Sequence, residues 1–237
     1  MFKYNLKMEK IEKIEKIENI ENNNVMTLNE WQNTFKEPKT LIVQGSVKNG
    51  KDEWQDFPIG MCYGYMMCDF NSISLQIGNH SKTVLCAIVE STDTRRRGNF
   101  SINRKIILQN LKNNSINNIK LSITDYFEKL PDYKFVISPE GNGIDCHRHY
   151  EALIAGCIPI IERNPLTEEK YKGLPILYTT DYTEINEEYL NKVYEEMKEV
   201  SYDFSRLFLS FYTEEQRQMI YDCGNYWTER WTKKKFY

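Results

Sequence analysis

FVISPEGNGIDCHRHYEALIAGCIPII, residues 135–161, contains the clearest signals of secondary structure in this chain. The apolar run at 134–138 predicts a strand, the glycine-containing segment after it predicts a loop, and residues 147–155 predict a helix that ends at Gly156. A second apolar run, 158–161, predicts another strand directly after the helix. A strand, a helix and a strand at this spacing form a βαβ unit with parallel strands and a right-handed crossover.

The same alternation continues on both sides of this unit. Residues 83–90, TVLCAIVE, are nearly all apolar, as in a parallel strand covered on both faces. The other expected elements are strands at 119–123 and 174–178, helices at 101–111 (with Ser101 as N-cap) and 125–130, and C-terminal helices at 186–200, 204–212 and 214–231. The sequence therefore predicts an α/β fold, a Rossmann-like parallel sheet with helices on both faces and a helical C-terminus.

Composition divides the 237 residues into three expected parts. Residues 1–25 are a low-complexity charged tail with repeated Glu-Lys-Ile triplets. Isoleucines spaced by three drift around a helix, so disorder or a lone charged helix is expected, with oligomerisation as the alternative. Residues 26–80, with a strand candidate at 40–44, form a small N-terminal α/β subdomain, and residues 81–237 form the Rossmann-like domain.

Charge and hydropathy exclude several classes of partner. The chain has 31 Lys plus Arg against 34 Asp plus Glu, a net charge of -3, so no nucleic-acid partner is expected. The longest apolar stretches, 59–68 and 152–161, are each 10 residues, too short to span a membrane. The charged N-terminus lacks the apolar core of a signal peptide, which predicts a cytoplasmic location. Six cysteines without a CxxC pair are expected to be mostly reduced and buried.

A candidate binding site lies between the two strands of the central βαβ unit. Ligands of open parallel sheets bind beyond the carboxyl ends of the strands, where residues 140–148 lie. Glycines there let backbone amides approach an anion, and the N-terminus of the next helix adds free N–H groups. Arg148 can bind phosphate, and Glu151 can accept hydrogen bonds from ribose hydroxyls. The alternative is structural, with Asp145 capping the helix and Glu151 pairing with Arg148.

A D-x-H-x-H pattern, formed by Asp145, His147 and His149, also suggests a possible metal site. Residues two apart on a helix point in directions about 200° apart, so the three side chains share an ion only on an extended loop. We expect no metal. His147 is instead expected to donate to a donor phosphate or a sugar hydroxyl, and His149 to be a packing or surface residue.

A second basic cluster follows the expected strand at 83–90. It consists of Arg95, Arg96 and Arg97, in a loop that leads to the same edge of the sheet. Their guanidinium groups could neutralise a leaving nucleoside diphosphate. The alternative is a solvated basic loop, and at least one of the three is expected to point to solvent. Arg104, one turn into the next helix, is a weaker candidate.

The string SPEGNGIDCHRHYEALIAGCIPII resembles the donor-site signature of exostosin-like glycosyltransferases and their virus-encoded and bacterial relatives. In that signature, a strand runs into a Gly-containing loop, an Arg, a Glu-Ala-Leu and a small-Gly-Cys-Ile-Pro strand. The downstream LPILYTTDYTEI is similar to the strand and helix start that follow in such enzymes. The resemblance covers about residues 83–185.

The resemblance implies a GT-B type enzyme whose C-terminal, Rossmann-like half binds a nucleotide-sugar without a bound metal or other cofactor. It places the family's ribose-binding Glu on Glu151 and its Arg on Arg148. Retaining GT-B enzymes often have two Glu eight positions apart, but Gly143 stands there, and the nearest acid is Glu140. The donor-binding set is Arg95, Arg96, Arg97, Glu140, Gly141, Asn142, Gly143, Asp145, His147, Arg148 and Glu151.

The expected activity is transfer of a sugar from a nucleotide diphosphate donor to a hydroxyl of a glycan or protein acceptor. The acceptor hydroxyl must lose a proton, and the acids of the acceptor-side subdomain at 26–80 that could serve as general base are Asp52, Glu53, Asp56 and Asp69. Two alternatives stay open, a catalytically degenerate nucleotide-sugar-binding protein and an interaction module. Trp227 and Trp231, four apart on one helix face, are expected to be core rather than a sugar platform.

Overall fold

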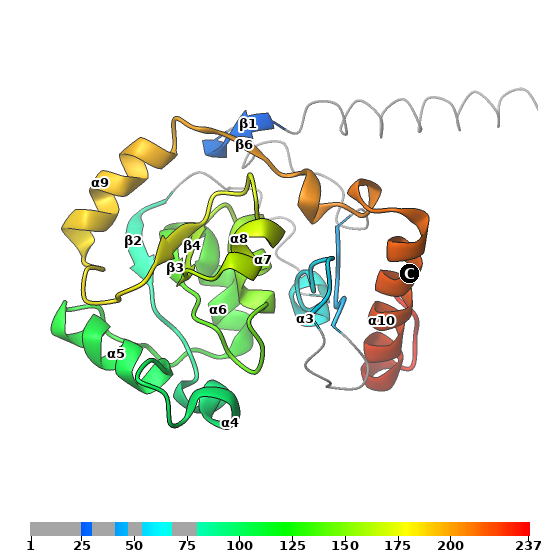
Figure 1. Cartoon of the computed structure of the whole chain (residues 1–237), viewed down its shortest axis with the longest axis horizontal. Helices are drawn as coiled ribbons and strands as arrows, with labels where there is room; N and C mark the ends of the chain where they lie inside the picture. The colour runs from blue at the N-terminus through cyan, green and yellow to red at the C-terminus, as the bar shows by residue number, and fades with distance from the viewer. Residues whose placement is uncertain (1–24, 30–40, 47–53, 68–79) are drawn as a thin grey trace, which may run out of the picture.

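The computed structural model describes residues 25–29, 41–46, 54–67 and 80–237 (Figure 1). Its centre is a four-stranded sheet in the order β2-β3-β4-β5, and every pair of neighbours is parallel. The strands are β2 (Lys82–Leu85), β3 (Tyr133–Ile137), β4 (Ile158–Glu162) and β5 (Leu177–Thr179). This is the predicted α/β, Rossmann-like fold.

Helices cover both faces of this sheet. All residues of β4 and the last three of β3 are buried, so the side chains that alternate between the two faces all lie against protein. Helix α7 (His147–Ile154) packs on β4, and α9 (Glu187–Met197), which follows β5, returns to β2 at the opposite edge. The ring of Tyr194 on α9 contacts Phe135 of β3. The other helices of this part are α4 (Thr94–Arg97), α5 (Arg104–Asn113), α6 (Ile123–Lys129) and α8 (Pro165–Lys170).

The central βαβ unit forms as the sequence predicts. Helix α7 begins at His147, and Gly156 follows its end with φ +79°, a left-handed conformation that glycine adopts without a Cβ penalty. The predicted strands at 134–138 and 158–161 and the helix at 125–130 correspond to β3, β4 and α6. Among the described residues, no helix is both long enough and apolar enough to cross a bilayer.

Two elements between β2 and β3 differ from the sequence-based expectation. The helix expected at 101–111 starts at Arg104, because the side chain of Asn103, not Ser101, accepts the Ile106 amide as N-cap. The strand expected at 119–123 is absent from this described segment. There the side chain of Asn118 bonds both the N–H and the C=O of Ile88, next to a backbone bond from the Ile119 amide to the Cys86 carbonyl.

The helix expected at 204–212 is also wrong. Strand β6 (Ser201–Asp203) precedes this segment, and the segment itself forms two 3₁₀ turns, Ser205–Leu207 and Leu209–Phe211. Phe208 between them is extended and bridges Leu41 antiparallel, while the Ile42 amide donates to the Leu207 carbonyl. Pairing with the N-terminal part of the chain therefore overrides the local helical pattern.

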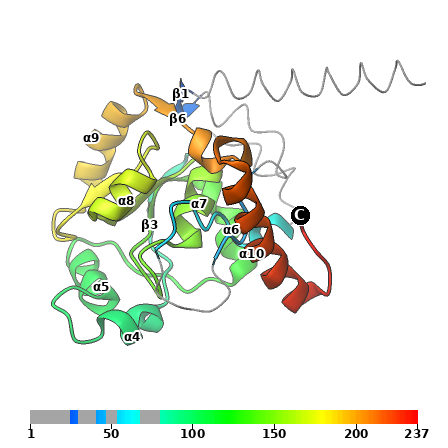
Figure 2. The ribbon, with the colours of Figure 1, turned by 45° about the vertical axis from the view of Figure 1, so that its right-hand side comes forward.

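The N-terminal segments pack against the C-terminal ones. Strand β1 (Val25–Thr27) pairs antiparallel with β6. Of the strand expected at 40–44, the described residues 41–44 form isolated bridges from Leu41 and Val43. Helix α3 (Tyr63–Met67) lies beside α10 (Glu214–Thr232), at the end of the molecule away from α5 and α9 (Figures 1 and 2). The proposed division at residues 25/26 and 80/81 stays a prediction; residues 1–24 of the expected charged tail lie outside the described residues, and its last residue, Val25, begins β1.

The described cysteines Cys62, Cys86, Cys146, Cys157 and Cys223 are free, three of them buried and two half-buried. Burial raises the pKa of Cys86 and of Cys146 to about 12, although nearby arginines lower both values in part. Thiols with such pKa values stay protonated at neutral pH, so these side chains act as small apolar groups, as the sequence predicts.

Candidate donor site at the carboxyl edge of the sheet

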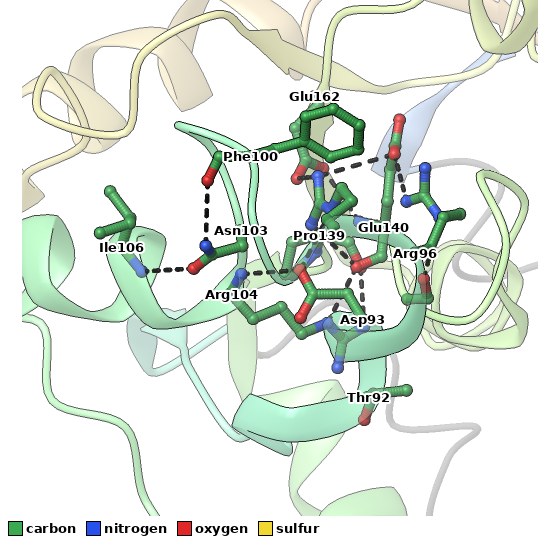
Figure 3. A network of polar contacts seen from close by, with 12 residues as sticks. Thr92, Asp93, Arg96, Phe100, Asn103, Arg104, Ile106, Pro139, Glu140 and Glu162 are labelled. Atoms are coloured by element: carbon green, nitrogen blue, oxygen red, sulfur yellow. Dashed lines mark hydrogen bonds and ion pairs between the residues drawn. The ribbon is translucent and has the colours of Figure 1, made fainter.

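Polar side chains from three neighbouring strands meet at the carboxyl edge of the parallel sheet (Figure 3). After β2 the chain forms a 3₁₀ turn, Glu90–Asp93, and then α4; after β3 it forms the loop 138–146; and β4 ends on Glu162. The sequence predicts a ligand site at this edge because parallel strands all present their carboxyl ends there.

Arg97 is the centre of a buried ionic network at this edge. Its Nε donates to Asp93 Oδ2 at 3.0 Å, Nη1 to Glu162 Oε1 at 2.8 Å, and Nη2 to the Glu140 carbonyl at 3.1 Å. Burial alone lowers the pKa of Arg97, but the charge of Glu162 and the other carboxylates outweighs burial and raises it. The guanidinium thus joins the segments after β2, β3 and β4.

Two more arginines hold the loop that follows β3. Arg104 donates from Nη2 to the Pro139 carbonyl at 2.8 Å and from Nε to the Glu140 carbonyl at 2.9 Å. Arg96 donates to Glu140 Oε2 at 2.5 Å and to the Gly141 carbonyl at 3.3 Å. The carbonyls of residues 139, 140 and 141 are therefore all bound by arginine side chains.

The three predicted donor-binding arginines differ in exposure. Arg97 is buried, Arg96 is half-buried, and Arg95 is exposed, in agreement with the expectation that at least one of them points to solvent. They lie on the short helix α4 rather than in the loop that the sequence predicts. Of the three, Arg96 combines a site-facing contact with partial access to solvent.

Several backbone N–H groups of the loop have no hydrogen-bond partner among the described residues. A Cβ at Gly141 would lie 3.0 Å from Arg104 Nη2, so a side chain there would press on the arginine that supports the loop. Gly141 itself donates to the Gly143 carbonyl. Within the described part of the chain, the amides of Asn142, Gly143, His147 and Arg148 form no hydrogen bond. These are the loop and first-turn groups that an anion at a helix N-terminus would contact.

Asp145 does not cap α7, because Cys146 is the N-cap residue and no side chain caps the helix. The Asp145 carboxylate accepts from Lys170 Nζ at 3.0 Å, from the Tyr171 hydroxyl at 2.5 Å and from the Ile59 amide at 3.2 Å. Burial raises the pKa of Asp145, but the charge of Lys170 and the Tyr171 hydrogen bond outweigh burial and lower it. Asp145 thus links the loop to α8 and to the N-terminal segment.

His147 connects the start of α7 to the N-terminal segments. Its Nδ1 lies 2.7 Å from the Gly60 carbonyl, which only accepts, so Nδ1 carries the proton. Gln44 accepts the Tyr63 amide with Oε1, so its Nε2 faces His147 Nε2 at 3.0 Å and donates to it. The hydrogen-bond partners of His147 therefore assign the Nδ1–H tautomer to its ring. Gln44 is buried with φ +55°, a strained conformation for a residue other than glycine.

His149 is a buried packing residue, as the sequence allows. The Ser138 hydroxyl lies 2.7 Å from its Nδ1, and burial lowers the pKa of His149 to about 4. Asp145, His147 and His149 therefore have separate partners and do not converge. Within the described residues, no group of three His, Cys, Asp or Glu side chains is arranged to hold a metal ion.

Arg148 and Glu151 lie one turn apart on α7 and do not pair with each other. Arg148 Nη1 donates to the Ala87 carbonyl at 2.8 Å, and its guanidinium stacks 4.4 Å from the Tyr126 ring centroid. Glu151 is 5% exposed and accepts the Cys62 amide at 3.3 Å. The structural alternative of an Arg148–Glu151 ion pair is wrong, and the ribose-binding role of Glu151 stays a prediction.

The candidate general bases are only partly described. Asp56 is exposed, whereas Asp52, Glu53 and Asp69 lie outside the described residues. The choice of base stays a prediction.

Trp231 is 54% exposed, so the expectation that the Trp227 and Trp231 pair belongs to the core is wrong for this residue, because its helix face has no covering element among the described ones.

The sequence reasoning missed several residues of this network. Asp93 stands four positions before Arg97, a helical ion-pair spacing, and Glu162 is a charged residue at the end of an otherwise apolar strand; both are signals that the sequence contains. Lys170 and Gln44 carry no such signal, because their partners are 25 and 103 residues away along the chain.

The parallel sheet makes this a Rossmann-like α/β protein. Its polar groups gather beyond the carboxyl ends of the strands, where ligands of such sheets usually bind. Residues 65–222, more than half of the chain, match the family model described as the RXYLT1 C-terminal domain. The protein therefore belongs to this family, a glycosyltransferase family whose namesake is a ribitol xylosyltransferase. A search of curated proteins finds no match. The narrower resemblance to exostosins stays a prediction.

Proposed function

We propose that this protein transfers a sugar from a nucleotide diphosphate donor to a hydroxyl acceptor, with the donor bound at the carboxyl edge of the parallel sheet. The observation that carries the proposal is the family match, which spans the whole β3–α7–β4 unit and its loop. The name of the family adds a testable choice of substrates, a xylosyl donor and a ribitol acceptor.

In this proposal the diphosphate binds to the amides of the loop and of the first turn of α7. The groups available are the N–H groups of Asn142, Gly143, His147 and Arg148, which have no partner in the described structure. Arg96 adds a guanidinium that is half-buried and bound to Glu140. When the donor binds, phosphate oxygens compete with the Glu140 carboxylate for Arg96, because both are anionic acceptors.

Several residues of the site then have a proposed task. The loop amides and Arg96 stabilise the charge that develops on the leaving diphosphate. Arg97 and Arg104, whose donors all bind protein groups, hold the loop in place. Glu151 is proposed to accept from the donor ribose, and an acid of residues 26–80 to take the proton of the acceptor hydroxyl. Metal-independent transfer, an acceptor that is a glycan or protein, and a cytoplasmic location are further proposals.

The test is release of nucleoside diphosphate from a panel of UDP- and GDP-sugars that includes UDP-xylose, with and without ribitol. We expect release from one donor, stimulated by acceptor. Arg96→Ala should weaken donor binding about ten-fold, because it removes one charge-assisted hydrogen bond. Lys105→Ala, which removes an exposed cation from α5, is the control and should bind like the wild type.

A catalytically degenerate nucleotide-sugar-binding protein is the second candidate. The observation that favours it is the charge balance of the network in Figure 3, in which the carboxylates Asp93, Glu140 and Glu162 pair with Arg96 and Arg97. The Arg104 guanidinium there binds the backbone carbonyls of Pro139 and Glu140. Measurable binding of a nucleoside diphosphate, without release or transfer from any sugar donor of the panel, would support this candidate and reject turnover.

A further inference from the structure

Two tryptophans form an aromatic surface on the last turns of α10. The rings of Trp227 and Trp231 lie 5.8 Å apart between centroids, with 34° between their planes. Trp227 is half-buried, whereas Trp231 is 54% exposed. An amphipathic ring of this size, exposed beside a second one, offers a ligand a flat apolar face together with an N–H donor.

This surface is fixed and lies near the start of α7. Trp227 Nε1 donates to the Ser46 carbonyl at 2.9 Å, and the Ser46 hydroxyl lies 3.3 Å from Nε2 of His147, the first residue of α7. The ribbon shows α10 running along the side of the molecule that also carries α3 (Figures 1 and 2). The aromatic surface is thus connected, through one residue, to the proposed donor site.

Four cations stand next to Trp231. Arg230, Lys233, Lys234 and Lys235 are all exposed, and within the described residues none of them pairs with a carboxylate. The whole chain carries a net charge of -3, so this cluster is a local exception. Unpaired cations beside an aromatic face favour a ligand that has both an anionic group and an apolar face.

The lysine-bearing turn is held in a defined conformation. Lys233 ends α10 with φ +62°, and the Asn225 side chain accepts the amides of Phe236 and Tyr237, both at 2.9 Å. The Tyr237 hydroxyl accepts the Val43 amide at 2.7 Å. The lysines are therefore presented by a turn anchored on both sides.

We propose that Trp227, Trp231 and the cations Arg230 and Lys233–235 form a binding site for an anionic glycan, which serves as the acceptor of the transfer reaction. The C–H face of a sugar ring packs on the exposed face of Trp231, and a phosphate or sulfate ester binds the lysines. The aromatic and basic residues lie outside the matched residues 65–222. The role as acceptor site rests on the proposed function, whereas glycan binding does not.

A glycan fits better than a nucleic acid or a membrane. The basic surface is small, the chain as a whole is acidic, and the aromatic surface consists of two rings on one helix. A nucleic acid would require a longer basic track along which the phosphates could bind. A membrane surface would require a broader apolar face than one exposed tryptophan supplies.

The experiment measures binding of pentamannosyl phosphate to the full chain by calorimetry and tryptophan fluorescence. The same oligosaccharide after phosphatase treatment serves as the neutral ligand. A heparin-derived tetrasaccharide replaces phosphate by sulfate. The variants are Trp231→Ala and a triple Gln substitution of Lys233, Lys234 and Lys235. Matched controls are Met219→Ala, an exposed apolar residue of the same helix, and a triple Gln substitution of the exposed Lys105, Lys112 and Lys120.

We expect the charged glycans to bind, with affinity that falls as salt rises, and each site variant to bind about five-fold more weakly. Both controls should bind like the wild type. Equal binding of the neutral glycan, unchanged binding by the site variants, or stronger binding of a single-stranded oligonucleotide or of anionic lipid vesicles would overturn the proposal.

Donor turnover is measured separately by release of nucleoside diphosphate with and without ribitol. Release from the wild type together with no glycan binding would reject the aromatic site and leave the transferase proposal in place. Glycan binding without any release would reject the transferase and leave the site as a glycan-binding surface.

Discussion

Replacing Lys170 by Met tests the buried contact that joins the β3–α7 loop, α8 and the N-terminal segment. Lys170 Nζ donates to Asp145 at 3.0 Å and to the Phe57 carbonyl at 3.1 Å, and it lies 3.8 Å from the Trp54 ring centroid. Met keeps most of the apolar stem of Lys170 but leaves the Asp145 carboxylate buried without its counter-charge. We therefore expect a large loss of stability.

The size of the stability loss depends on the hydrogen-bond donors that still bind the Asp145 carboxylate. Breaking a buried ion pair by removing one partner costs about 3–5 kcal/mol. Tyr171 and the Ile59 amide still donate to Asp145, so we expect the lower end, about 3 kcal/mol of unfolding free energy. For a chain of this length that corresponds to a melting temperature lower by about 6–12 °C. Lys172→Met, at an exposed position, is the control and should change stability by less than about 0.5 kcal/mol.

The direction in which the stability cost of Lys170→Met changes with pH follows from the pKa of Asp145. In the wild type the pKa of Asp145 is lowered, so its stabilising contribution is present above the unfolded pKa and is lost only as the pH falls through the lower folded value. Without Lys170, burial raises the pKa of Asp145, and protonation relieves the buried charge. The cost of Lys170→Met should therefore shrink between about pH 7.5 and about pH 5.

Urea unfolding of the full chain at both pH values measures this. Adding Asp145→Asn to Lys170→Met should recover more than about 1 kcal/mol of the stability lost by the single variant, since the two side chains contact each other. The reasoning is refuted if the cost of Lys170→Met is under 1 kcal/mol or equal at the two pH values.

Three further outcomes are expected. Glu151→Ala should weaken binding of UDP or GDP by more than about ten-fold if the carboxylate binds ribose; calorimetry showing unchanged affinity would reject that role. Gly141→Ala should weaken donor binding while the melting temperature changes little, because its Cβ would press on the Arg104 side chain and shift the loop. An unchanged dissociation constant would contradict this. Gly224→Ala places a Cβ 2.6 Å from the Tyr237 ring and should cost about 1–3 kcal/mol in chemical unfolding; a variant as stable as the wild type would show that the C-terminal turn is not packed as described.

The candidate site was predictable from the sequence in its location but not in its internal contacts. The run of apolar residue types before and after residues 139–157 identifies the βαβ unit, and the βαβ unit places the loop at the carboxyl edge of the sheet. The pattern cannot assign partners to the charged side chains. Arg97 was a predicted diphosphate ligand, yet in the fold its donors bind Asp93, Glu162 and the Glu140 carbonyl.

The errors in secondary structure share one physical cause. Residues 119–123 and 204–212 have apolar patterns that fit a strand and a helix, but each segment is bonded to a part of the chain far away in sequence. Asn118 bonds Ile88, and Phe208 bridges Leu41. Local propensity is a weak preference that such contacts override.

Local periodicity and chain connectivity, which can be read in the sequence, predict the α/β class, the central strand–helix–strand unit and the loop between them as the candidate ligand site. The folded chain is needed to show which arginines are buried and how His147 and Asp145 join the N-terminal segments. The same holds for the exposure of Trp231 beside four cations that pair with no carboxylate of the described chain. These features depend on contacts between residues up to about 100 positions apart, and packing in three dimensions, not pattern, brings such residues together.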